Sequence, residues 1–131
     1  MLAVDLDRDG REELVVAFGG WRAYDVRVLR KDPGTHKLVA VARDKLGSVF
    51  GLGALRSVQG EPRVVAEVFH REPNPLVFPR DRPFGAPPGT YLLALEGGRL
   101  VRRAHVPFVT DSDGAVADGV HWQALVGDID G

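Results

Sequence analysis

Acidic residues near the N-terminus are the side chains whose types and spacing could do chemistry. Asp5, Asp7 and Asp9 alternate over five residues, and Gly10 and then Glu13 follow them. Three carboxylates this close repel one another, so an ordered loop favours a cation among them. Hard oxygen donors at this density suit Ca²⁺, which takes about 6–8 oxygen ligands. Gly10 allows the sharp turn that would return Glu13 to the aspartates.

Two other interpretations of this loop are an EF-hand and a metal-free turn. An EF-hand opens with the same D-x-D-x-D-G pattern, but it needs a glutamate at loop position twelve. That position is Val16, and the following apolar residues indicate a strand where an EF-hand needs a helix. The EF-hand is therefore excluded. An aspartate-rich turn whose carboxylates accept hydrogen bonds from backbone N–H groups stays open, although the full set of acids favours calcium.

The elements that must position this loop are predicted to be strands. The apolar segments are short, rich in Val, Leu and Phe, and broken by turn residues, as in all-β proteins. Residues 14–18 form a continuous apolar run typical of a buried central strand, and residues 24–29 alternate apolar and polar side chains. Turn chemistry at 32–35 (DPGT) predicts a returning strand over 38–42.

The second half of the chain combines a hairpin with an irregular stretch. Residues 91–96 and 99–104 flank Gly97-Gly98, which is a two-residue hairpin signal. Residues 71–89 hold six of the nine prolines, and a central strand cannot lack so many N–H donors. We expect a long loop or edge insertion there, which packs its own aromatic side chains.

A weak internal repeat relates the two halves. Residues 4–16 align with residues 54–66, so that Gly10 meets Gly60 and an apolar run follows each glycine. At the positions of the three aspartates, the second copy has Leu55, Ser57 and Gln59.

A third copy is predicted to start within residues 124–131, where Asp128 and Asp130 correspond to the first two aspartates of the loop. Each repeat unit holds about four strands, which is the content of a β-propeller blade. The expected units are about 1–48, about 49–119 with the proline-rich insertion, and the start of a third at about 120–131. The predicted fold class is all-β, with antiparallel four-stranded blades.

Residues 4–16, with the sequence VDLDRDGREELVV, resemble the FG-GAP or VCBS repeat of integrin-α-like β-propellers. The pattern of that family is D-x-D-x-D-G-x-x-[DE] followed by an apolar strand, with calcium bound in the loop between the first two strands of a blade. The resemblance implies these calcium ligands: Asp5, Asp7, Asp9, the backbone carbonyl of Arg11, and Glu13. Because the second loop departs from the pattern, we expect it to bind no metal.

The resemblance also predicts that the chain is a segment of a longer protein. A propeller closes with about 4–8 blades, and this chain supplies about two. The remaining blades are expected elsewhere in the parent chain, because isolated blades expose unpaired strand edges. Alone, the segment is expected to be marginally stable or to self-associate.

By this resemblance, the protein is an extracellular or periplasmic interaction or adhesion module in which calcium is structural. Its partner would be a protein or a carbohydrate ligand. The alternative is a scaffold of a secreted carbohydrate-active enzyme, a lyase or hydrolase, with a pocket near residues 71–89. No convergent acid–base pair in the sequence supports catalysis, so we name no catalytic residue.

Composition excludes several other classes. The chain has 17 basic and 18 acidic side chains and a formal net charge of -1, so no overall field would attract nucleic acid. No apolar run reaches the roughly 18 residues of a membrane span. There is no cysteine, which removes disulfides and thiolate metal sites.

The remaining polar clusters favour structural roles. The segment 111–114 (DSDG) lacks a correctly spaced following acid and is read as an ordinary turn. The four histidines lack metal-ligand spacing, and only His70, beside the insertion, borders a possible site of chemistry. We interpret the basic cluster of Arg99, Arg102 and Arg103 as a solvated strand face. The two tryptophans, Trp21 and Trp122, are expected to pack between blades.

Overall fold

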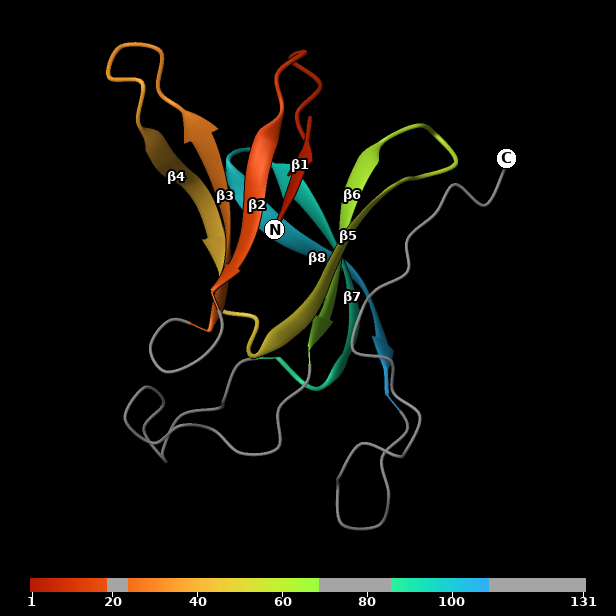
Figure 1. Cartoon of the computed structure of the whole chain (residues 1–131). Coiled ribbons are helices and arrows are strands. Elements are labelled where there is room, and N and C mark those ends of the chain that lie inside the picture. Colours follow the sequence, from red (N-terminus) through yellow and green to blue (C-terminus); the bar gives the residue numbers. More distant parts are fainter. Residues whose placement is uncertain (19–23, 69–85, 109–131) are drawn as a thin grey trace.

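A computed structural model describes residues 1–18, 24–68 and 86–108, which form two antiparallel four-stranded sheets (Figure 1). The prediction of an all-β, antiparallel fold is confirmed for these residues, which include no helix. In the described part of the chain, accordingly, no helix is long and apolar enough to cross a membrane.

The first sheet has its strands in chain order, β1-β2-β3-β4. The strands are β1 (Leu2–Val4), β2 (Glu13–Phe18), β3 (Asp25–Lys31) and β4 (Leu38–Asp44). In the two central strands, the valines Val15, Val26 and Val28 are fully buried, as expected for β-branched side chains on the covered face of a sheet. The predicted turn between β3 and β4 is present, and Asp32 Oδ1 accepts hydrogen bonds of 2.8 Å from the N–H groups of Gly34 and Thr35.

The second sheet repeats this arrangement in the order β5-β6-β7-β8. Its strands are β5 (Val49–Arg56), β6 (Pro62–Val68), β7 (Gly89–Glu96) and β8 (Arg99–Pro107). The predicted hairpin at Gly97-Gly98 joins β7 to β8, and both glycines have positive φ, as a type I′ turn requires. The predicted insertion lies largely outside the described residues, and Gly89 already belongs to β7, where it pairs with Val68.

The aligned halves of the sequence occupy equivalent positions in the two sheets. Residues 4–16 lead from β1 into β2, and residues 54–66 lead from β5 into β6. Gly10 and Gly60 both adopt positive φ, at 85° and 76°, in the connections between these strands. Figure 1 shows both connections at the same end of the molecule, together with the β3–β4 turn.

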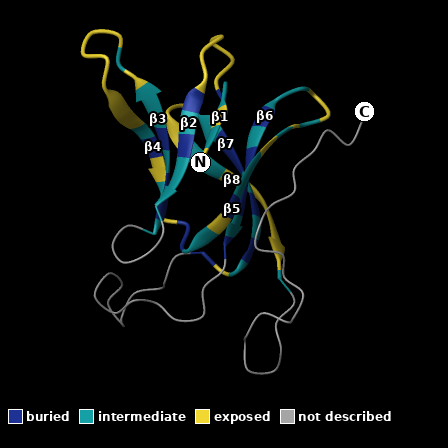
Figure 2. Cartoon of the chain, viewed as in Figure 1, coloured by how far each residue is buried: buried dark blue, intermediate teal, exposed yellow. Residues whose placement is uncertain are grey.

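The two sheets pack against each other with equivalent strands in contact. β1 and β2 contact β5, and β4 contacts β8. Buried side chains from both sheets form one apolar cluster, whereas the connections, the first residues of β4 and most of β8 are exposed (Figure 2). At the outer strands, Arg102 of β8 donates two hydrogen bonds to Asp44 of β4, of 2.6 and 2.8 Å.

The connection between the sheets is also fixed by packing. Leu46 is fully buried, and its carbonyl accepts a 2.9 Å hydrogen bond from the N–H of Ala86. The N–H of Gly47 donates to the carbonyl of Tyr24 at 3.1 Å. These bonds tie the start of the second sheet to the first.

Candidate metal centre

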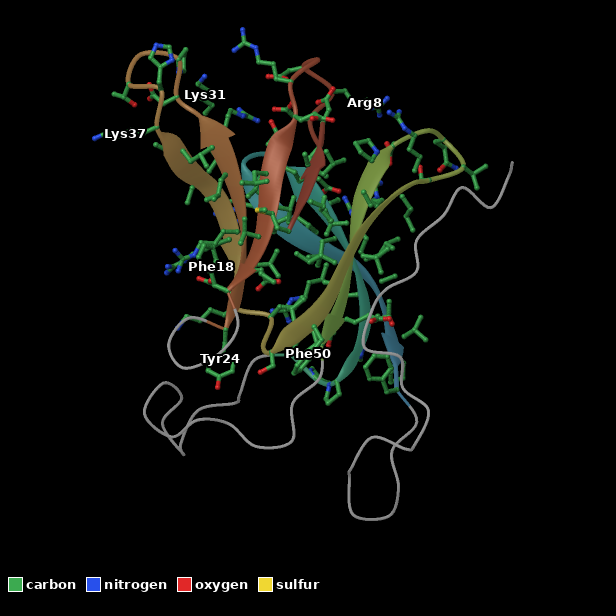
Figure 3. The ribbon with its side chains drawn as sticks, in the orientation of Figure 1. Arg8, Phe18, Tyr24, Lys31, Lys37 and Phe50 are labelled. Atoms are coloured by element: carbon green, nitrogen blue, oxygen red, sulfur yellow. The ribbon has the colours of Figure 1, made fainter. Side chains whose placement is uncertain are left out.

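The acidic segment forms the connection between β1 and β2. Val4, the last residue of β1, pairs with Glu13, the first residue of β2. This register brings Glu13, the ninth residue of the segment that starts at Asp5, back beside Asp5. The connection leaves the sheet at the upper end in Figure 3, where the labelled Arg8 projects from it toward the second sheet.

Within the loop, aspartate carboxylates accept hydrogen bonds from the backbone. Asp5 accepts from the N–H groups of Asp9 and Gly10, at 3.1 and 3.0 Å. Asp7 also accepts from the N–H of Asp9, at 3.2 Å, and Asp9 accepts from that of Arg11, at 2.8 Å. These are the bonds expected of the aspartate-rich turn, and they hold the loop in a defined shape.

Glu13 is the anchor of the site, because its side chain is 0% exposed. Its Oε2 accepts a 2.9 Å hydrogen bond from the N–H of Leu6, on the far side of the loop. Its Oε1 accepts two hydrogen bonds from the guanidinium of Arg30, at 3.1 Å from Nε and 2.8 Å from Nη2. A buried carboxylate is stable only with such compensation, which Leu6 and Arg30 supply.

Arg30 of β3 bridges two of the acids. Besides its bonds to Glu13, its Nη2 lies 2.5 Å from Asp7 Oδ2. The hydrogen bond to Glu13 raises the pKa of Arg30 above its usual value, and burial opposes this effect. Arg30 is thus the cation that neutralises part of the acidic loop.

Sequence reasoning missed Arg30, although its position carries a signal. Leu14 pairs with Leu29, so Glu13 and Arg30 come next along the two neighbouring strands. On β3, Arg30 also continues the alternation of the buried Val26 and Val28. A charged residue at a position where the alternation predicts a buried apolar side chain indicates a buried partner of opposite charge.

Three of the predicted ligands come together. Asp5, Asp7 and Glu13 each offer a carboxylate oxygen, and these oxygens all lie within 4.8 Å of one another. Asp9 and Arg11 lie in the adjoining turn of the same loop. The donor set fits a hard divalent cation, because the three carboxylates converge from both ends of one loop, and among the described side chains the cation paired with them is Arg30.

The equivalent loop of the second sheet, between β5 and β6, is held by local hydrogen bonds and an ion pair. Ser57 takes the position of Asp7, and its Oγ accepts a 3.1 Å hydrogen bond from the N–H of Glu61. Backbone bonds from Gly60 to Ser57 and from Ser57 to Glu61 complete the turn. Arg63, at the position of Glu13, forms an ion pair with Glu61. This turn is therefore built from local polar contacts without a cluster of carboxylates among its described side chains.

The other polar residues singled out in the sequence divide into two groups. Arg102 and Arg103 are ion-paired, to Asp44 and Glu96 respectively, in agreement with a structural strand face. Arg99, His36 and His105 are exposed. The following residues and segments lie outside the described residues: Trp21, His70, the DSDG segment at 111–114, His121, Trp122, Asp128 and Asp130.

In the described part of the chain, the fold and the loop define an all-β arrangement of two packed four-stranded sheets with an acidic loop between β1 and β2. Comparisons of the chain with protein-family models, with curated proteins and with solved structures found no match.

Proposed function

We propose that the chain is a calcium-binding segment of an FG-GAP/VCBS-like β-propeller that serves as an extracellular or periplasmic interaction module. The β1–β2 loop is its calcium site, with Asp5, Asp7, Asp9, the carbonyl of Arg11 and Glu13 as ligands. The calcium is structural, and the partner is a protein or a carbohydrate.

The arrangement of the sheets supports the propeller part of this proposal. Each sheet has four antiparallel strands in chain order, as a propeller blade has. The sheets stack so that the first strands, β1 and β5, are in contact, and so are the last strands, β4 and β8. Neighbouring blades around a propeller axis have this relation, since each blade repeats the position of the one before it. Closure would take further blades of the same kind.

The observation that carries the calcium proposal is the convergence of Asp5, Asp7 and Glu13 within 4.8 Å. Three carboxylates face the single positive charge of Arg30, so the cluster keeps an excess of negative charge. A divalent cation would offset that excess and would link the start of the loop to the end. Extracellular sites of this type need an affinity of only about 10⁻⁴–10⁻³ M, which confines their occupancy to calcium-rich compartments.

A calcium-stabilised loop would keep one end of the module ordered for binding. The β1–β2 and β5–β6 connections lie at that end (Figure 1), and Arg8 and Glu61 connect them through an ion pair of 3.8 Å. Connections presented by a rigid sheet scaffold are frequent binding surfaces in proteins. The partner is therefore expected at this end.

Thermal melting in excess calcium and in chelator tests the calcium site. A ligand at 100 times its Kd stabilises the folded state by about 2.7 kcal/mol, which corresponds to a midpoint shift of several degrees. Asp7→Ala should abolish the shift, whereas Ser57→Ala, at the equivalent position of the second loop, should retain it. A full calcium response in both variants would refute the assignment of the ligands.

A further inference from the structure

The guanidinium of Arg30 contacts two of the three carboxylates that would hold a cation in the acidic loop. Arg30 donates to Glu13 Oε1 at 2.8 and 3.1 Å and to Asp7 Oδ2 at 2.5 Å. Asp7 and Glu13 belong to the trio of carboxylates that converge within 4.8 Å. A metal ion held by both side chains must therefore share their oxygens with Arg30 or displace it.

We propose that Arg30 is a built-in counter-ion that competes with the metal for Asp7 and Glu13, and so sets the calcium affinity of the loop. This inference rests on the proposed calcium site and concerns its regulation. Arg30 keeps the metal-free loop folded by neutralising two of its acids. The same contacts weaken metal binding, because they must be loosened before the two carboxylates can turn to an ion.

The contacts and the exposure of Arg30 explain both effects, the stabilisation of the metal-free loop and the weaker binding of metal. Glu13 is buried and rigidly held by Leu6, so its contact with Arg30 stabilises the metal-free state. The side chain of Arg30 is 35% exposed and comes from a neighbouring strand, so a bound cation would displace it toward solvent and take over its contacts with the carboxylates. Its planar fork contacts two carboxylates at once, which a lysine ammonium reproduces poorly.

The test compares calcium binding by isothermal titration calorimetry in the wild type, Arg30→Gln and Lys31→Gln. Lys31 is the matched control, since it is the next residue on β3, is exposed, and carries the same charge away from the loop (Figure 3). Arg30→Gln should lower the Kd for calcium about tenfold, a change of about 1.4 kcal/mol. Lys31→Gln should leave it within about twofold, because Lys31 is exposed and forms no ion pair with Asp5, Asp7 or Glu13.

The melting temperature in chelator measures how far Arg30 stabilises the metal-free protein. In chelator, Arg30→Gln should melt at a lower temperature than the wild type and Lys31→Gln. If Arg30→Gln fails to fold in chelator, Arg30→Lys replaces it, and its Kd should lie between those of the wild type and the tenfold-tighter value.

The calcium affinities of the wild type and the Arg30 variants distinguish three outcomes. Equal calcium affinities in the wild type and the Arg30 variants would overturn the competition while leaving the calcium site intact. Calcium binding by Arg30→Gln alone would support competition in its strongest form. If calcium binds to none of these proteins, both the proposed site and the competition are wrong.

Discussion

Replacement of Glu13 by alanine should destabilise the metal-free protein by about 2–3 kcal/mol. The N–H of Leu6, a residue only 4% exposed, would lose its acceptor, at a cost of about 1–3 kcal/mol. Loss of the ion pair with the partly exposed Arg30 would add about 1 kcal/mol or less. Relief of repulsion from Asp5 and Asp7 would offset part of this sum.

The assay is urea unfolding in chelator, followed by far-UV circular dichroism, with the change taken from the midpoint at a constant slope. Glu12→Ala is the matched control, because Glu12 is an exposed acid in the same loop. It should change the free energy of unfolding by no more than about 0.5 kcal/mol. Glu13→Gln keeps an acceptor for the N–H of Leu6 and should fall between the two. Equal stability of Glu13→Ala and Glu12→Ala would refute the role given to the buried carboxylate.

Two further outcomes test the packing and the turns. Hydrogen bonds from the N–H groups of Thr35 and Gly34 lower the pKa of Asp32, so its ionised form stabilises the β3–β4 turn above the unfolded pKa near 3.8. That contribution should disappear as the pH falls through the lowered pKa, and an NMR titration of the Asp32 carboxyl would detect an ordinary value if the turn were absent. A double-mutant cycle on Arg102→Ala and Asp44→Ala should give a coupling energy of about 1 kcal/mol between the outer strands. Strictly additive effects would contradict the contact between β4 and β8.

The strands β2, β3, β4, β7 and β8 were predicted from the sequence, because their signals are local. The alternation that places Val26 and Val28 on one face, and the Gly97-Gly98 hairpin, depend on residues close together in the chain. The alignment placed Gly10 opposite Gly60, and both glycines lie in inter-strand connections with positive φ, a conformation that favours glycine.

The composition of the site was predictable only in part. The spacing of Asp5, Asp7 and Glu13 indicated a shared loop, and the pairing of Val4 with Glu13 explains why the ninth position returns to the first. Arg30 is remote in sequence, and its place beside Glu13 depends on the register between β2 and β3. The strand pairing that fixes such a contact forms between distant segments. The alternation along β3 therefore indicates that Arg30 has a buried acidic partner, but it does not identify Glu13 as that partner.

The most direct test of calcium binding by the β1–β2 loop is a calcium titration followed residue by residue through backbone amide NMR shifts. If the acidic loop binds calcium, the largest shifts should fall on residues 5–13, with Asp5 and Glu13 at the two ends of the affected loop. Residues 55–63, the equivalent loop without the acids, serve as the internal control and should stay in place. Shifts of equal size in both loops, or no shift in residues 5–13 at millimolar calcium, would contradict the account.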